Sequence, residues 1–85
     1  MEYTDFSKIT ISNRLDASWQ LCPVPILMAQ EKIAGMAHGA VLEVIFTDPG
    51  ARPDLEAWCR INGHELIAFQ NGKTKNSAYI KKKKI

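Results

Sequence analysis

Cys22-Pro23-Val24-Pro25 is the segment of this chain whose residue types and spacing best suit chemistry. The cysteine stands between a strand-like and a helix-like segment, so we expect its sulfur just before the first turn of a helix. Unpaired backbone N–H groups and the positive end of the helix dipole favour a thiolate there over a thiol. The thiolate is the nucleophile, and such a position lowers the pKa of a cysteine from about 8.5. The segment therefore predicts a nucleophilic Cys22.

The two prolines of this segment predict a rigid support for the sulfur. Proline fixes φ and removes a backbone donor. Pro25 suits the first helical turn, where the missing donor costs nothing. Pro23 restricts the preceding Cys22 to extended conformations. We therefore expect Pro23 and Pro25 to hold the site without reacting.

Cys59 is the second cysteine, and its spacing places it on the inner face of a helix predicted over residues 52–62. Leu55 and Trp58 share that face, and cysteine is among the residue types most often buried, so a core role is predicted. The alternative is that Cys59 resolves an adduct on Cys22, which requires the two sulfurs to lie close together. A disulfide between them is not expected in a reducing cytosol.

The residue types predict neither a metal nor a bound cofactor. A four-ligand zinc site needs more than two cysteines and the isolated His38 and His64. Both histidines neighbour glycines, which predicts turn residues. Met28 and Met36 fit helix packing better than a cofactor role.

Six elements must position these residues, in the order β-α-β-α-β-β. Strands are predicted over residues 9–16, 41–47, 65–70 and 74–82, with a two-residue hairpin turn at Asn71-Gly72. Helices are predicted over residues 25–36 and 52–62. The first has an inner stripe of Ile26, Ala29, Ile33 and Met36, widened by Leu27 and Ala34.

This order predicts an α/β (α+β) two-layer sandwich, with a mixed four-stranded sheet and two helices on one face. The β-α-β unit requires a parallel strand pair with a right-handed crossover, and the final hairpin adds an antiparallel pair. Apolar residues on both faces of residues 41–47 predict an interior strand. Gly63 marks the end of the second helix.

The 85 residues suit one domain, with residues 1–8 as a loose N-terminal arm and residues 81–85 as a basic C-terminal tail. The lysines at 81–84 account for more than the net charge of +2, so the rest of the chain is slightly acidic. A terminal lysine run is usually a solvated tail or a guard on an edge strand, and an electrostatic contact with RNA or an acidic partner is the alternative. The chain has neither a basic, apolar signal segment nor a run long enough to cross a bilayer, so a cytoplasmic location is predicted.

Leu15-Asp16-Ala17 followed by Cys22-Pro23-Val24-Pro25 resembles the TusA/SirA-like sulfur-carrier family. In that family a Leu-Asp pair and a short loop precede Cys-Pro-x-Pro at the start of the first helix. Three further segments match in register, namely Asp48-Pro49, Asp54 and Gly63-His64-Glu65-Leu66. The resemblance covers about residues 9–83 with the same order of elements.

The resemblance implies that Cys22 accepts sulfane sulfur as a persulfide and relays it to another protein. The implied partners are a sulfur-donor protein, either a cysteine desulfurase or a rhodanese-like protein, and a sulfur-acceptor protein. Delivery to tRNA thiolation, molybdenum-cofactor assembly or sulfur oxidation is consistent with the resemblance. The activity implied is that of a persulfide sulfurtransferase or sulfur carrier.

Trp19 departs from the family, which usually has a glycine near this position. Tryptophan does not adopt positive φ as cheaply as glycine, so we expect the loop to take another path. One hypothesis is that Trp19 forms part of a partner-docking surface, since exposed aromatic residues often anchor interfaces. The other is that it folds back onto the core.

Asp16 and Arg52 are further candidate site residues. Asp16 either orients the loop before the cysteine or is an ordinary turn residue at the end of a strand. A carboxylate beside a thiolate would raise the pKa of the thiol, so we expect Asp16 to bond the backbone instead. Arg52 is predicted to offer positive charge to a partner or donor anion.

Two other functions compete with sulfur transfer. A non-catalytic RNA-binding or regulatory module is one, because small domains with this order of elements often bind RNA. Direct nucleic-acid binding is not favoured, since no strand face rich in aromatic residues is evident. A thiol–disulfide oxidoreductase is the other. Its motif requires a second cysteine where this chain has Pro25, so it would depend on Cys59 approaching Cys22.

Overall fold

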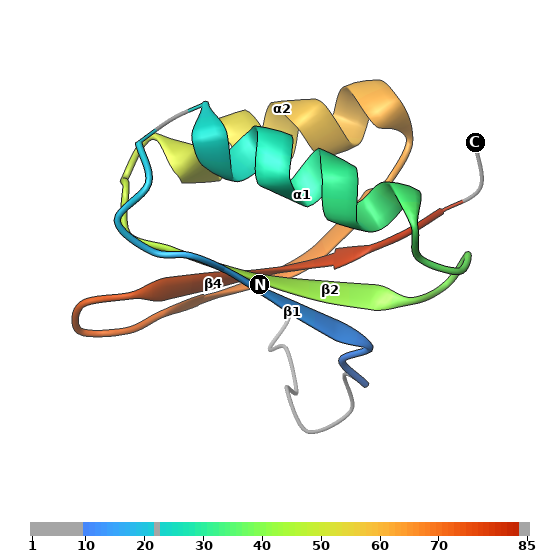
Figure 1. The fold of residues 1–85 in the computed structure, drawn as a ribbon, viewed down its shortest axis with the longest axis horizontal. Coiled ribbons are helices and arrows are strands. Elements are labelled where there is room, and N and C mark those ends of the chain that lie inside the picture. Colours follow the sequence, from blue (N-terminus) through green and yellow to red (C-terminus); the bar gives the residue numbers. More distant parts are fainter. Residues whose placement is uncertain (1–9, 22, 84–85) are drawn as a thin grey trace, which may run out of the picture.

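The computed structural model describes residues 10–21 and 23–83, and both helices cover one face of a four-stranded sheet (Figure 1). The elements are β1 (Asn13–Ala17), α1 (Val24–Ala34), β2 (Val41–Phe46), α2 (Ala51–Asn62), β3 (Glu65–Asn71) and β4 (Asn76–Lys81). The predicted two-layer α+β architecture and the predicted order of elements are confirmed.

The strands lie in the order β1-β2-β4-β3. β1 and β2 are parallel and are joined through α1, whereas β4 runs antiparallel to both β2 and β3. β2 therefore lies inside the sheet, as its apolar residues on both faces predict.

Both helices start at the same end of the sheet, where the parallel strands β1 and β2 finish (Figure 1). The loop that leads into α1 and the loop that leads into α2 consequently lie next to each other. They are joined directly, because the backbone N–H of Trp19 donates to Thr47 Oγ1 at 2.8 Å. Any chemistry in the loop before α1 takes place at this end of the molecule.

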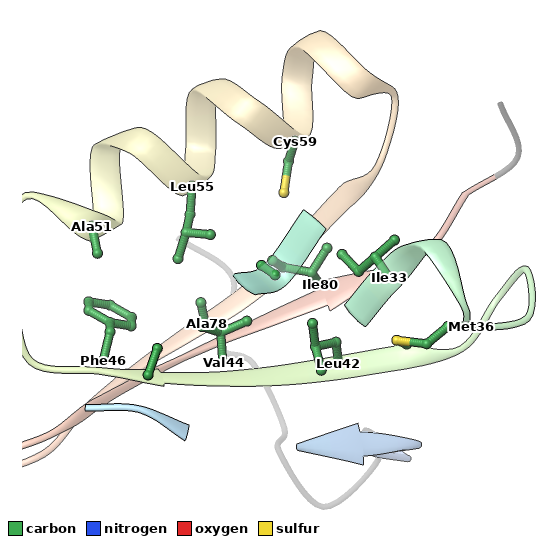
Figure 2. Packing of buried hydrophobic residues seen from close by; sticks show 12 residues of the cluster. Ile33, Met36, Leu42, Val44, Phe46, Ala51, Leu55, Cys59, Ala78 and Ile80 are labelled. Atoms are coloured by element: carbon green, nitrogen blue, oxygen red, sulfur yellow. The ribbon is translucent and has the colours of Figure 1, made fainter. Parts of the chain in front are cut away.

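The core fills the space between the sheet and the helices (Figure 2). β2 contributes alternate residues, and α2 contributes one face. The largest fully buried side chains include Leu42, Leu55, Ile80 and Val44. The inner stripe of α1 is narrower than predicted. Leu27 and Ala34 are exposed, because only the side of α1 that carries Ala29 and Ile33 meets the sheet.

β1 begins at Asn13 rather than at residue 9, which lies outside the described residues. Ser12 interrupts the pairing: its N–H donates to the Val41 carbonyl at 2.8 Å, but its own hydroxyl accepts from the Val41 N–H at 3.3 Å. A side chain thus satisfies the donor that a longer strand would pair with backbone.

The predicted two-residue turn at Asn71-Gly72 is wrong. Asn71 pairs with Asn76, so the β3–β4 hairpin has a four-residue loop at residues 72–75. Gly72 does not have positive φ, which the predicted turn type requires. A glycine is needed there for another reason, since an added Cβ would lie 2.4 Å from the Lys75 carbonyl oxygen.

The predicted basic tail at residues 81–85 is also wrong in its described part. Lys81 ends β4, which is an interior strand and not an edge. The Lys82 ammonium donates to the Met36 carbonyl at 2.8 Å, so it binds the chain just past α1. Lys83 lies 3.8 Å from the Glu65 carboxylate. These lysines belong to the fold. The predicted arm at residues 1–8 lies outside the described residues.

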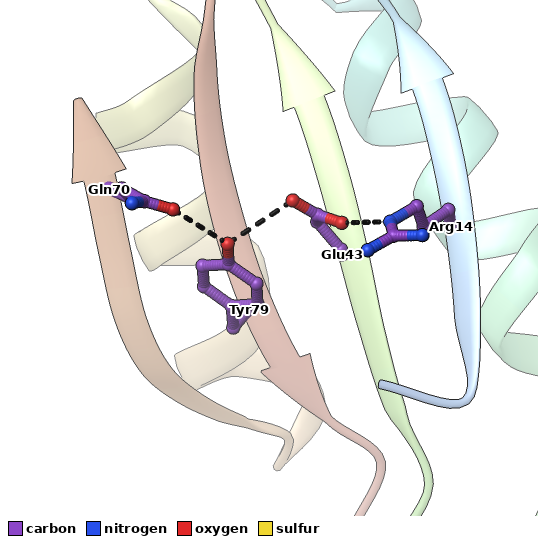
Figure 3. A network of polar contacts seen from close by, with 4 residues as sticks. All are labelled: Arg14, Glu43, Gln70 and Tyr79. Atoms are coloured by element: carbon purple, nitrogen blue, oxygen red, sulfur yellow. Dashed lines mark hydrogen bonds and ion pairs between the residues drawn. The ribbon is translucent and has the colours of Figure 1, made fainter. Parts of the chain in front are cut away.

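The sheet face away from the helices carries polar side chains that link all four strands (Figure 3). Arg14 Nε donates to Glu43 Oε1, and the Tyr79 hydroxyl oxygen lies 3.1 Å from Glu43 Oε2 and 3.0 Å from Gln70 Oε1. Burial raises the pKa of Glu43, but hydrogen bonds from Arg14, Ser77 and Tyr79 together outweigh it and leave the pKa below its ordinary value. The carboxylate is therefore a stabilising member of the sheet.

Replacing Glu43 with glutamine is expected to lower the free energy of unfolding at about pH 7 by about 1–2 kcal/mol, because a neutral amide is a weaker acceptor than a carboxylate. The folded chain holds the Glu43 pKa below its ordinary value. Its stabilisation is therefore present above that value and is lost as pH falls through the folded pKa. Below about pH 4.5 the wild type should lose stability more steeply than Glu43→Gln. Urea unfolding at about pH 7 and about pH 4 measures both effects.

The matched control is Glu56→Gln, because Glu56 makes an exposed ion pair with Arg52 at 3.9 Å. Exposed pairs of this kind contribute little, so a change below about 0.5 kcal/mol is expected. Equal losses in the two variants would contradict a stabilising role for the Glu43 network.

Candidate functional site

The loop between β1 and α1 begins with a turn that Asp16 fixes. Asp16 Oδ1 accepts a hydrogen bond from the Ser18 hydroxyl and another, at 3.0 Å, from the Ser18 N–H. These two bonds, the hydroxyl first, lower the pKa of the Asp16 carboxyl. The Gln20 N–H then donates to the Ala17 carbonyl at 3.3 Å and closes a four-residue turn. Asp16 thus bonds the backbone of the loop, as expected from its charge.

Trp19 is the third residue of this turn and has φ of +67°. The expectation that tryptophan would avoid positive φ is wrong. A left-handed backbone costs a residue with a Cβ about 1–2 kcal/mol. The hydrogen bond from the Trp19 N–H to Thr47 Oγ1 holds it there. The sequence does not predict this role of Thr47, because Thr47 is 28 residues from Trp19 and no local pattern connects the two.

The side chain of Trp19 does not fold back onto the core. It is 72% exposed, which rules out the core-packing hypothesis for this residue. Leu21 is 73% exposed, and Leu27 on the outer side of α1 is 56% exposed. A short stretch of chain therefore presents several large apolar side chains to solvent.

Helix α1 starts with Pro23 as its N-cap, and buried Pro25 lies in its first turn as predicted. The backbone donors there are already used. The Val24 N–H donates to the Leu21 carbonyl at 2.9 Å, and the Ile26 and Leu27 N–H groups donate to the Pro23 carbonyl. The predicted set of unpaired N–H groups is therefore absent from residues 23–27, since the prolines have none to offer. The dipole of α1 remains as a source of positive potential.

Cys22, the predicted nucleophile, lies outside the described residues. Its neighbours Leu21 and Pro23 are both exposed. The described residues on either side of position 22 are therefore at the surface, at the sheet end where both helices begin.

Cys59 lies in the core, as its place on α2 predicts. It is 2% exposed, and burial raises the pKa of its thiol to about 11. A thiol with that pKa is almost entirely protonated at neutral pH, so Cys59 is a packing residue and a poor nucleophile.

Arg52 lies in the first turn of α2, at the same end of the molecule as the loop before α1. Its guanidinium carbon lies 4.2 Å from the centre of the Phe69 ring, and its Nε lies 3.9 Å from Glu56 Oε2. The side chain remains half exposed. The fold thus positions the Arg52 charge close to the surface.

His38 is exposed, and His64 is held by two contacts within the fold. His64 Nδ1 accepts from the Lys83 N–H at 3.3 Å, and its ring packs against Trp58 with centroids 5.1 Å apart. Burial, and then the charge of Lys82, lower the pKa of His64. Residues 10–21 and 23–83 contain no group of three or more His, Cys, Asp or Glu side chains that could hold a metal ion.

In the same residues, neither helix has the length and apolar character needed to cross a membrane.

The sheet face away from the helices gives no support to RNA binding by base stacking. Tyr79 is the aromatic residue of the polar network on that face, and it is 4% exposed. A ring so covered has no free face on which a base could stack.

The fold and the sequence together define a class of small α+β sandwich domains in which a cysteine directly precedes, along the chain, a helix whose first turn contains proline. The family model described as sulfurtransferase TusA matches residues 13–82, and the chain belongs to this family.

The sulfur carrier protein TusA of Pseudomonas syringae pv. syringae is 37% identical over 75 residues, which is 88% of this chain and 89% of that protein. A putative sulfur carrier protein of Neisseria meningitidis serogroup A is 48% identical over 56 residues, or 66% of this chain and 76% of its own. The crystal structure of a SirA-like protein from Desulfitobacterium hafniense superimposes with a TM-score of 0.74. It covers 85% of this chain and 99% of its own at 20% identity, so it supports the fold alone.

Proposed function

We propose that this protein is a sulfur carrier that accepts sulfane sulfur as a persulfide on Cys22 and relays it to an acceptor protein. The observation that carries the proposal is Cys22-Pro23-Val24-Pro25, which falls inside the family match and directly before α1. The exposure of Leu21 and Pro23 on either side supports access by a second protein. The names of the relatives as sulfur carriers support the same conclusion.

The transfer needs only thiol chemistry. The Cys22 thiolate attacks the terminal sulfur of a donor persulfide and forms a new S–S bond. The S–S bond of the donor breaks, and its electron pair leaves with the donor thiolate. The proton on the terminal sulfur remains there, so that Cys22 becomes the persulfide. In the second step an acceptor thiolate attacks the same sulfur and releases the Cys22 thiolate. No net oxidant or reductant is consumed.

The other site residues act as supports. Pro23 and Pro25 begin α1, whose dipole favours an anion near its N-terminus. Asp16 fixes the turn at the start of the loop through Ser18. A general base is not required, provided that the thiolate is already present. The transfer as written uses no metal or cofactor.

The partners follow from the chemistry. A donor must present a persulfide, as a cysteine desulfurase or a rhodanese-like protein does, and an acceptor must present a thiolate. We place this exchange in the cytoplasm. The acceptor route is tRNA thiolation, molybdenum-cofactor assembly or sulfur oxidation. Arg52 is proposed as a contact for a partner or donor anion, because its half-exposed side chain lies at the same end of the fold.

The test is intact-protein mass spectrometry of reduced protein after incubation with a cysteine desulfurase and cysteine, with a rhodanese and thiosulfate, or with polysulfide. Wild type, Cys22→Ala and Cys59→Ala are compared. The expected result is a gain of one sulfur atom that reductant reverses and that only Cys22→Ala lacks. A folded wild-type protein that gains no sulfur from any donor would contradict the proposal. A gain that is lost only in Cys59→Ala would move the site to the core cysteine.

A further inference from the structure

The segment around position 22 carries no charge. Residues 17–30 of the sequence contain no Asp, Glu, Lys, Arg or His, although charged residues make up 24% of the chain. Asp16 and Glu31 bound this neutral stretch. A partner protein that contacts this segment therefore meets no charged side chain of residues 17–30.

The same segment exposes large apolar side chains. Trp19, Leu21, Val24 and Leu27 are 72%, 73%, 37% and 56% exposed. The turn bond from the Val24 N–H to the Leu21 carbonyl brings these two residues together. Val24 and Leu27 are three residues apart on α1 and so are neighbours on its surface. We call these four residues the apolar collar.

The backbone conformation of Trp19 indicates that the apolar collar contacts another protein. The residue is held at φ +67° by Thr47, where glycine would be relaxed, yet its indole gains little contact within the chain. An unfavourable backbone that presents a large apolar side chain to solvent contributes little to the fold. Backbone outliers of this kind gather at functional sites. Tryptophan is also among the residues that most often dominate binding energy at interfaces.

We propose that the apolar collar is the docking surface for the protein that exchanges sulfur with Cys22, with Trp19 as its anchor. The partner surface that fits it is apolar and carries few charges around its own sulfur-bearing cysteine. A charged partner surface would lose hydration against the collar without gaining an opposite charge. This inference rests on the proposed function and specifies the partner chemistry of the same site.

The experiment compares sulfur loading of Cys22 from a protein donor with loading from polysulfide. The protein donor is a cysteine desulfurase with cysteine, or a rhodanese with thiosulfate, whichever loads the wild type. Trp19→Ala is expected to slow loading from the protein donor about tenfold or more, as for an interface anchor. Loading from polysulfide should change less than about twofold, because a small donor needs no docking surface. The matched control is Ile61→Ala, since Ile61 is 78% exposed but lies near the opposite end of α2.

Two further measurements distinguish a role of Trp19 in contacting the partner from a role in the structure of the loop. In Arg52→Ala, which lacks the charged contact proposed above, loading by the protein donor should vary less than about threefold between about 0.05 M and about 0.5 M salt, because apolar contact is not screened. Trp19→Gly should slow protein-to-protein transfer as Trp19→Ala does, yet unfold at a higher urea concentration than the wild type, since glycine relaxes the backbone at φ +67°.

The outcomes are distinguishable from failure of the proposed function. If neither a protein donor nor polysulfide loads Cys22, sulfur carriage itself is wrong. If polysulfide loads Cys22 but no protein donor does, or if Trp19→Ala leaves protein transfer unchanged, the docking proposal is overturned alone. Equal slowing from both donors would make Trp19 a residue that shapes the loop. A dimer that dissociates in Trp19→Ala would assign the collar to a second copy of the chain.

Discussion

In the folded protein, iodoacetamide is expected to alkylate Cys22 at least about 20-fold faster than Cys59 at about pH 7.5. Burial raises the pKa of the Cys59 thiol to about 11. Compared with an ordinary thiol of pKa about 8.5, its thiolate fraction is then about 300-fold smaller. The greater nucleophilicity of a more basic thiolate offsets about tenfold of that difference. Steric protection of a side chain that is 2% exposed adds to what remains.

The rates are measured by mass spectrometry of peptides from protein quenched at successive times. The Cys59 rate should rise about tenfold per pH unit between about pH 6 and about pH 9, since its pKa lies above that range. The Cys22 rate should level off above its own pKa. In urea the two cysteines should react alike, which shows that the fold causes the contrast. Equal slow rates in the folded protein would leave no case for an accessible nucleophile at position 22.

The elements could be predicted because their signals are local. A run of apolar residues on both faces identifies β2, and Gly63 ends α2 in a left-handed conformation with φ of +77°. The bounds of α2 differ from the prediction by a single residue, Ala51. In each case the residues that specify the element lie within it or beside it.

The hairpin was predicted wrongly because the prediction used only the local Asn-Gly pair, whereas the loop length depends on how β3 pairs with β4. Asn-Gly favours a two-residue turn. The β3–β4 ladder contains an irregularity between Leu66 and Ala68, and its register pairs Asn71 with Asn76. That register leaves four residues in the loop. Pairing along the whole ladder thus decides the turn.

At the candidate site, too, the features with local sequence signals could be predicted, and the features that depend on distant contacts could not. The sequence predicts a site at Cys22, Pro23 and Pro25 through local spacing, and α1 starts at these prolines, where the same spacing predicts a helix. Two features depend on groups that only the fold brings together. Thr47 holds Trp19 in its conformation from another loop, and the Leu21 and Pro23 carbonyls use the N–H groups that the sequence leaves open. Backbone hydrogen bonds of this kind have no residue-type pattern to reveal them.

Replacing Leu55 with alanine is expected to lower the free energy of unfolding by about 2–5 kcal/mol, the usual cost of truncating a fully buried leucine. Leu55 is 0% exposed and points from α2 into the core above the sheet (Figure 2). A chain of this size has a total stability of about 4–13 kcal/mol, so the loss removes a large part of it. Urea unfolding followed by tryptophan fluorescence measures the change.

Ile61→Ala is the matched control, because it shortens an aliphatic side chain on the same helix that is 78% exposed. A change below about 0.5 kcal/mol is expected there. At a temperature where Leu55→Ala remains folded, its Cys22 should alkylate at the wild-type rate, since α1 and the Trp19–Thr47 bond do not involve Leu55. A lower Cys22 rate in folded Leu55→Ala would show that the core sets the reactivity of the loop. An unchanged rate would show that the helix start and its neighbouring loop are sufficient.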